Sequence, residues 1–264
     1  MIWQVIDSLK YLRGLEDCSL QVVCDGYSVR LAEKIRGNNP WSMSKIGVII
    51  PEAAALYEQY CNRLENEFEE SKQQNPCSRS LSLLRLSSHH GFAFAVQEAL
   101  SRADTPYVLI IQHDRAFVKY FDMISSLVDA CENDPTIRYI GFPTTTSSKH
   151  DEHQHSQYRV RDALLPLCRS LEPISVGINQ KTEKTEINLV PLIFWYDSNH
   201  LAHVKRYLEI YRPFTNAPAE LRSVIGSRGL KDMLLRRGDF IEDRVGQVLT
   251  LSRYLLKRKC HQFR

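Results

Sequence analysis

Apolar and polar positions alternate in a way that predicts strands and helices in turn along the first half of the chain. Short apolar runs with the length of strands lie at 20–24, 46–50, 81–86, 107–111 and 137–142. Apolar side chains recur at the helical spacing of three or four positions in 3–14, 51–71, 91–103 and 117–131. Such alternation is typical of an α/β fold with a mostly parallel central sheet flanked by helices.

The pattern loosens in the second half. Pro143 to Gln157 is polar, and we expect a mobile loop there. Two strand-like stretches follow, at 174–178 and 187–196, and then helical patterns at 199–211, 230–237 and 241–256. No linker rich in Gly, Ser or Pro divides the chain. We therefore expect one domain over 1–264, with a first half of about 1–142 and a second half of about 143–264.

Composition and charge narrow the class of protein. Apolar residues make up 43% of the chain and charged residues 25%, which is ordinary for a soluble globular protein. No apolar segment reaches the ~18 residues of a membrane span. The net charge of +3 is too small to predict a nucleic-acid partner. The basic tail 253–264 suits a solvated helix end, or a weak contact with a membrane surface or a phosphate.

The cysteines bear on the cellular compartment. The chain has seven of them, scattered and without Cys-x-x-Cys spacing. Cys24, Cys131 and Cys168 lie in apolar surroundings, which favours reduced core thiols and a cytoplasmic location.

Candidate chemistry begins where the apolar run 107–111 ends, because Gln112, His113 and Asp114 follow it at once. Ligands of open α/β sheets bind outside the carboxyl ends of the strands, so Asp114 is placed to bind a metal or a substrate. Magnesium and manganese prefer oxygen ligands and keep waters and substrate phosphates, so one protein carboxylate can suffice. The alternative is that Asp114 caps a helix.

Two glycines mark further candidate positions. Asp25-Gly26 follows the run 20–24 and reads either as a plain turn or as a carboxylate that contacts a nucleoside. Gly91, after His89-His90, opens a helix whose free amides suit an anion, although a routine strand-to-helix turn has the same pattern.

Later in the chain, Glu242-Asp243 begins the helical pattern 241–256. Capping alone explains adjacent acids there, but a paired carboxylate could also act as a general base. His150, His153 and His155 lie in the polar loop without the spacing of a metal site, so we interpret them as solvated.

The order of these pieces resembles the GT-A glycosyltransferases, in particular their family-2-like members. The matching segments are Val22–Gly26, Gly91–Leu100, Ile110–Asp114 and Ile241–Asp243. Gln112 stands where the family has the first acid of its DXD motif, and the chain opens in what would be the helix after the family's first strand.

The resemblance implies an enzyme that moves a sugar from a nucleotide-diphospho-sugar to an acceptor hydroxyl, with inversion and with help from manganese or magnesium. By this likeness Asp25 contacts the nucleoside, Asp114 binds the metal and the diphosphate, and Asp243 is the base, with Glu242 beside it. Gly26, Gly91, Gln112 and His113 would complete the donor site. The acceptor would be a carbohydrate, a lipid-linked group or a protein.

Other functions remain open. A catalytically inactive GT-A-like protein that binds nucleotides or acts as a scaffold is one. A nucleotidyltransferase is another, but it would normally have a Gly-rich basic phosphate loop near its first strand, and the sequence shows none.

Overall fold

The computed structural model of the chain describes residues 1–31, 46–74, 80–144, 173–179, 184–191, 197–211 and 261–263. Contacts divide these residues into two compact units. The large unit comprises residues 1–14 and the described residues from 104 onward, and the small unit comprises the described residues of 15–103. The expected halves on either side of residue 142 remain a prediction.

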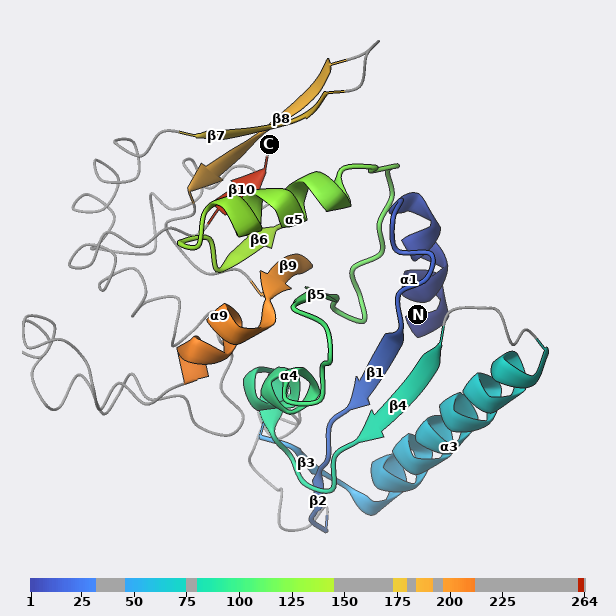
Figure 1. Cartoon of the computed structure of the whole chain (residues 1–264). Coiled ribbons are helices and arrows are strands. Elements are labelled where there is room, and N and C mark those ends of the chain that lie inside the picture. Colours follow the sequence, from blue (N-terminus) through green and yellow to red (C-terminus); the bar gives the residue numbers. More distant parts are fainter. Residues whose placement is uncertain are drawn as a thin grey trace, which may run out of the picture. The chain divides into compact units, whose positions relative to one another are not determined.

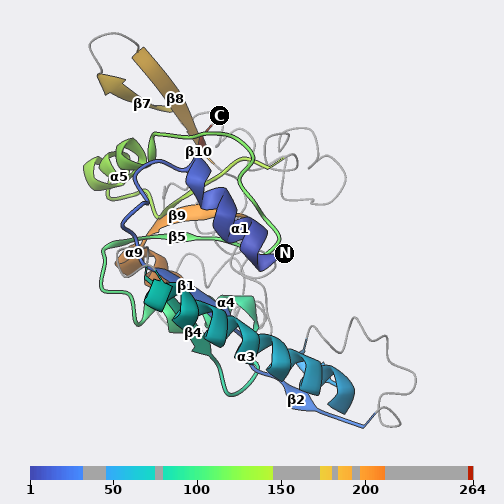
Figure 2. The same cartoon turned by 90° about the vertical axis from the view of Figure 1, so that its right-hand side faces the viewer.

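The small unit is built on two parallel strands, β1 (Leu20–Cys24) and β4 (Leu81–Arg85), which pair with Leu20 opposite Leu81. A long helix, α3 (Pro51–Gln74), connects them and contacts β4 (Figures 1 and 2). Helix α4 (Gly91–Leu100) follows β4 and contacts β1. The short strands β2 (Ser28–Val29) and β3 (Val48–Ile49) form a second parallel pair. The predicted alternation of strand and helix is confirmed in this unit.

Helix α3 begins at Pro51, as predicted, because proline suits the first turn of a helix. Its buried stripe consists of Ala54, Cys61, Leu64 and Phe68. Leu56 lies outside this stripe and is 66% exposed. Successive helical residues are about 100° apart, so the side chain next to a buried position points well away from the stripe.

The large unit contains a sheet in which the described strands follow the order β5-β9-β6-β10-β8-β7. Their bounds are β5 (Tyr107–Ile110), β9 (His200–His203), β6 (Tyr139–Gly141), β10 (His261–Phe263), β8 (Lys184–Pro191) and β7 (Ile174–Asn179). Among these strands, only β6 and β10 pair in parallel. The protein is therefore α/β with some parallel pairs, and the expected mostly parallel central sheet is replaced by small, mixed sheets.

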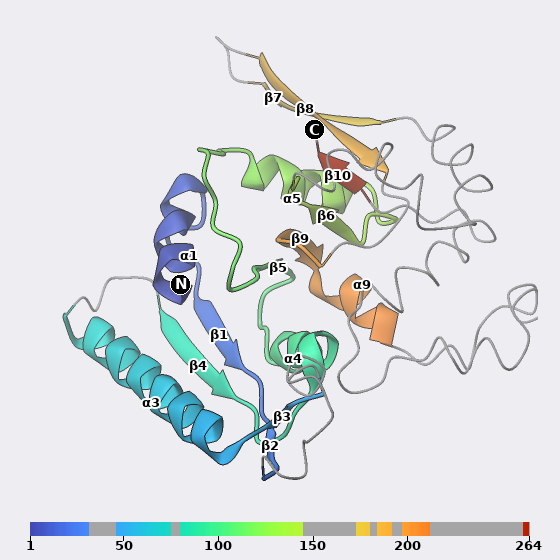
Figure 3. The same ribbon diagram turned by 180° about the vertical axis from the view of Figure 1, so that it is seen from behind.

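The mixed order has an identifiable cause in strand β9. This strand pairs antiparallel with β5 on one side and with β6 on the other (Figure 3). Its residues were expected to open a helix over 199–211, but helix α9 spans only Val204–Leu208 and is followed by the 3-10 turn η3 (Glu209–Tyr211). Two ladders of backbone hydrogen bonds outweigh a weak local helical pattern.

Strand β5 also differs from expectation. Its four residues are half-buried rather than fully buried, and it stands first in the order of the described strands. The apolar run was expected to lie in a mostly parallel central sheet. It is paired antiparallel to β9 instead, and a sequence run alone does not report the direction of a partner strand.

The helices of the large unit are α1 (Ile2–Ser8) with the 3-10 turn η1 (Leu9–Tyr11), and α5 (Ile124–Asn133). The helix predicted from Phe117 begins only at Ile124. The rings of Phe117 and Phe121 pack edge-on against Phe142, at centroid distances of 5.2 and 5.6 Å. These two apolar residues therefore belong to an irregular segment that packs on the sheet, although their spacing in the sequence matches that of a helix.

Two smaller findings concern the cysteines and the lengths of the helices. Cys24, Cys61 and Cys131 are buried free thiols, and burial is the main cause that raises the pKa of Cys24 and of Cys131 to about 12. Within the described residues, the helices are too short or too polar to span a bilayer.

Candidate functional site

The carboxylate of Asp25 caps helix α4 from the end of strand β1. Its Oδ1 accepts the N–H groups of Gly26 and His90, at 2.9 and 2.8 Å, and its Oδ2 accepts the N–H of Gly91 at 2.8 Å. The first amides of a helix have no partner inside the helix, and an anion there also suits the helix dipole. Asp25 therefore supplies, from 65 residues away, the cap that His90 itself does not provide.

A side chain completes the surroundings of this carboxylate. The Nδ1 atom of His89 lies 2.9 Å from Asp25 Oδ2. A carboxylate oxygen only accepts, so this ring nitrogen carries the hydrogen. Three backbone N–H groups and the His89 ring thus surround this carboxylate.

Two glycines allow this arrangement. A Cβ atom on Gly26 would overlap the backbone of Ser88, so the end of β1 and the loop before α4 can approach only if residue 26 has no side chain. Gly91 has a φ of 74°, in the left-handed region that L side chains avoid. Gly91 was predicted to open a helix whose free amides suit an anion, and in the structure its N–H donates to the Asp25 carboxylate of the chain itself.

We expect Gly26→Ala to lower the free energy of unfolding by about 2 kcal/mol, because a methyl group forced into packed backbone displaces its neighbours. Urea unfolding of the purified protein measures this. Ser28→Ala, an exposed change two residues away, is the matched control. Equal stability of the two variants would show that the loop around Ser88 moves aside without cost.

Tyr57 of α3 contacts the backbone of Asp25. Its hydroxyl donates to the backbone oxygen of Asp25 at 2.8 Å, and its ring packs edge-on against Tyr27 at 5.6 Å. Burial is the main cause that raises the pKa of Tyr57, so its hydroxyl stays a neutral donor. The position of Asp25 is thus defined through both its side chain and its backbone.

Asp114 lies in a turn that follows strand β5. The N–H of Arg115 donates to the backbone oxygen of Gln112 at 3.1 Å, so His113 and Asp114 are the two central residues of a four-residue turn. His113 and Asp114 are exposed, and the Asp114 side chain is 51% accessible. The alternative reading, an aspartate that caps a helix, is not met, because no helix begins at this turn.

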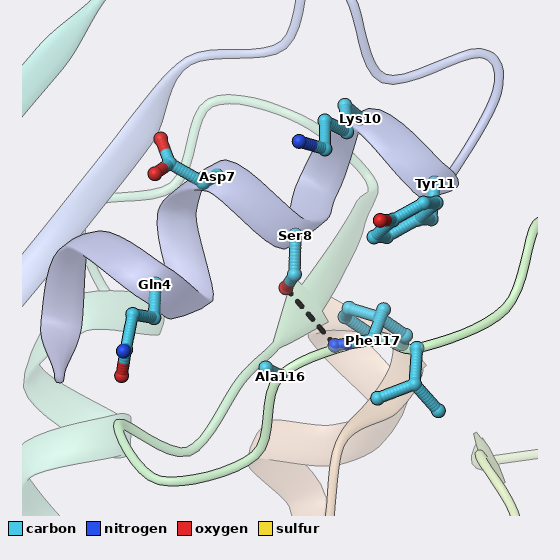
Figure 4. A pocket seen from close by; sticks show the side chains of 8 residues that line it. Gln4, Asp7, Ser8, Lys10, Tyr11, Ala116 and Phe117 are labelled. Carbon is cyan, nitrogen blue, oxygen red and sulfur yellow. Dashed lines mark hydrogen bonds between the residues drawn. The ribbon is translucent and has the colours of Figure 1, made fainter.

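The residues after this turn lie along α1 and η1. The N–H of Phe117 donates to the hydroxyl of Ser8 at 2.9 Å (Figure 4). That hydroxyl donates to the backbone oxygen of Val5 at 2.6 Å. Further along, Phe121 N–H donates to the backbone oxygen of Tyr11 at 2.8 Å. Between the two segments is an open depression of about 360 Å³, lined by Gln4, Asp7, Ser8, Lys10, Tyr11, Ala116, Phe117 and Val118 (Figure 4).

A divalent cation at Asp114 would depend on oxygens from outside the protein. No group of three or more His, Cys, Asp or Glu side chains in the described part of the chain is arranged to hold a metal. Asp114 offers one accessible carboxylate, with Arg115 Nε 4.0 Å from its Oδ1. Manganese or magnesium accepts one such ligand when diphosphate and water oxygens fill the other positions. The residues fit this kind of site, and they do not form a preassembled one.

The remaining predicted positions lie outside the described residues. These are Glu242, Asp243, the histidines at 150, 153 and 155, and the loop from 145 onward. Asp25, Gly26 and Gly91 come together in the small unit, and Gln112, His113 and Asp114 share one turn in the large unit.

The structure places two further residues beside the predicted ones. His89 contacts the Asp25 carboxylate, and the side chain of Asn199 bonds to both ends of the Asp114 turn. The doublet His89-His90 before a glycine was a visible signal for the first. Asn199 is 87 residues from Gln112, and no periodic pattern reports such a contact.

Comparisons with protein-family models, with curated proteins and with solved structures give no match to this chain.

Proposed function

We propose that this protein is a GT-A-like glycosyltransferase that moves a sugar from a nucleotide-diphospho-sugar to an acceptor hydroxyl. The observation that carries the proposal is the exposed Asp114 carboxylate in a hydrogen-bonded turn directly after strand β5. Ligand chemistry in α/β proteins concentrates at the carboxyl ends of strands. The strand-helix order β1, α3, β4, α4, β5 and the Asp25-Gly26 and Gly91 positions support the same reading.

The proposed roles follow from the resemblance and from the chemistry of the side chains. Asp25 and its neighbours Gly26 and Gly91 serve the nucleoside end of the donor, and Gln112, His113 and Asp114 serve the diphosphate end. A divalent cation bound at Asp114 would supply positive charge to the leaving diphosphate. Asp243, with Glu242 beside it, takes the proton of the acceptor hydroxyl, whose oxygen then bonds to the sugar's anomeric carbon as the bond to the diphosphate breaks.

The runner-up is a catalytically inactive protein of the same architecture that binds nucleotides or acts as a scaffold. Two observations favour it. Gln112 replaces the first acid expected in the turn, and the Asp25 carboxylate already accepts three backbone N–H groups of the chain and contacts the His89 ring. Binding without turnover would distinguish this function from the enzyme.

The decisive experiment is a thermal-shift screen of nucleotide-diphospho-sugars, each with and without manganese. A ligand that binds only the folded protein raises the unfolding midpoint, by an amount that grows with the ratio of concentration to Kd. The best donor is then incubated with acceptors, and release of nucleoside diphosphate is measured. Midpoint shifts with no release would favour the inactive protein, and the absence of any shift would count against both functions.

Asp114→Ala should remove the manganese-dependent part of the midpoint shift and leave the fold intact, because the Asp114 side chain is exposed and lies 4.0 Å from Arg115 Nε in a long ion pair. Asp122→Ala, another exposed aspartate of the large unit, is the control and should keep the full shift. If Asp114→Ala responds to manganese and donor as the parent protein does, the metal lies elsewhere.

A further inference from the structure

Asn199 hydrogen-bonds to both ends of the turn that carries Asp114. Its Oδ1 accepts the N–H of Gln112 at 3.0 Å, and its Nδ2 donates to the backbone oxygen of Arg115 at 2.7 Å. We propose that Asn199 is the positioning residue of this turn and sets where the Asp114 carboxylate meets the metal and diphosphate of the donor. This inference rests on the proposed function and adds a residue that it does not contain.

The chemistry of an asparagine side chain fits this task. One end of the turn offers an N–H donor and the other end offers a carbonyl acceptor. A primary amide accepts at its oxygen and donates at its nitrogen, and both atoms lie in one plane. A carboxylate could accept at both atoms but not donate, and an alkyl side chain could do neither. The Asn199 side chain therefore satisfies one backbone group at each end of the turn.

Asn199 is itself fixed in the sheet of the large unit. It is only 7% exposed and lies directly before strand β9. Its backbone oxygen accepts the N–H of Phe142 at 2.8 Å. The next residue, His200, pairs with Ile110 of β5 and with Gly141 of β6. Asn199 thereby connects the turn to the sheet at the point where β9 pairs with β5 and β6.

The need for such a residue follows from the single carboxylate. Where several acids bind a metal, a small shift of one is absorbed by the others. Here Gln112 takes the place of the first acid, so the position of the Asp114 carboxylate alone determines how the protein would bind the metal. Without Asn199, the turn residues would sample several conformations, and binding would have to restrict them at a cost in affinity.

The test compares the parent protein with Asn199→Ala, Asn199→Asp and the control Asn188→Ala. Asn188 is an exposed amide on β8 of the same sheet, and its Oδ1 accepts the hydroxyl of Ser175 at 2.8 Å. Two quantities are measured for each protein. Calorimetry gives the Kd for manganese with the adenosine, guanosine, cytidine, uridine and thymidine diphosphates. Hydrogen exchange gives the protection of the Gln112 amide, and circular dichroism checks the fold.

We expect Asn199→Ala to raise the Kd for the manganese-nucleotide probe about tenfold and to speed exchange of the Gln112 amide, because both ends of the turn are released. Asn199→Asp keeps the acceptor for Gln112 but places an oxygen against the Arg115 carbonyl. It should keep the Gln112 amide protected and still weaken binding. Asn188→Ala should match the parent in both measurements.

Two results would overturn the inference in different ways. If the parent binds a probe and folded Asn199→Ala binds it equally well, Asn199 does not position Asp114. If the parent binds no probe in a manganese-dependent manner, the proposed function fails and this role fails with it. Exchange at Gln112 then still reports whether Asn199 orders the turn, so the two failures are distinguishable.

Discussion

Replacing Asp25 by alanine is expected to lower the free energy of unfolding by about 3 kcal/mol, since a charged cap is lost and buried amides are left unpaired. The carboxylate accepts the N–H groups of Gly26, His90 and Gly91 and contacts the His89 ring. These bonds join the end of β1 to the start of α4. The loss should therefore appear as unfolding of the small unit at lower urea concentration.

Asp17→Ala is the matched control, because Asp17 is an exposed aspartate of the same unit. Urea unfolding followed by circular dichroism measures both variants. If Asp25→Ala is no less stable than Asp17→Ala, the carboxylate is not a structural cap, and its four contacts contribute little. The result also guides the nucleotide experiments, because a loss of binding in Asp25→Ala is informative only at temperatures where the variant stays folded.

The second large effect concerns pH and the buried residue His200. Its side chain is fully buried, its Nδ1 lies 2.5 Å from the backbone oxygen of Ser198, and its Nε2 lies 3.0 Å from the hydroxyl of Tyr207. A carbonyl oxygen only accepts, so Nδ1 carries the hydrogen and Nε2 accepts from Tyr207. Burial lowers the pKa of His200 from 6.5 to about 4, with a smaller opposing effect of the Ser198 bond.

The direction of the pH effect follows from proton binding. Between pH 6.5 and about 4 the unfolded chain binds a proton at His200 and the folded protein does not. Stability from this residue is therefore fully present above pH 6.5 and is lost as the pH falls toward 4. The pKa difference corresponds to a loss of about 3 kcal/mol.

Two measurements check this expectation. In the parent protein, NMR should show the His200 ring staying neutral down to about pH 5, below its ordinary pKa of 6.5. In His200→Phe, which keeps an aromatic ring between Tyr139 and Tyr207, unfolding free energy should depend less steeply on pH in this range. A His200 ring that titrates near pH 6.5 in the folded protein would refute the expectation, whatever the stability of the variant.

His200 and Asn199 also show how the sheet and the candidate metal turn depend on each other. Asn199 bonds to the turn, and the next residue pairs with β5 and β6 and fills a buried position. Acid conditions that protonate His200 should therefore disturb the turn as well as the core. Binding experiments at Asp114 are best done near pH 7, where His200 is neutral.

The sequence by itself determined the elements whose signals are local. Local signals predicted the apolar runs of β1, β4 and β5, the proline that begins α3 and the glycine that begins α4. Each signal acts within a few residues, so it can be recognised without knowing which elements pack together. The placement of Asp25 directly after β1, and of Asp114 in the turn that follows β5, was predictable for the same reason.

Only the tertiary structure decided how these elements pair and what their ends contact. Strand β9 forms although its sequence has a helical pattern, because the hydrogen-bonded ladders with β5 and β6 stabilise a strand more than the local pattern stabilises a helix. Phe117 and Phe121 pack on Phe142 instead of extending α5. The cap from Asp25 to α4 and the bonds from Asn199 to the Asp114 turn join residues 65 to 87 positions apart. Contacts at such separations leave no periodic trace, because they depend on where the folded backbone brings each polar group.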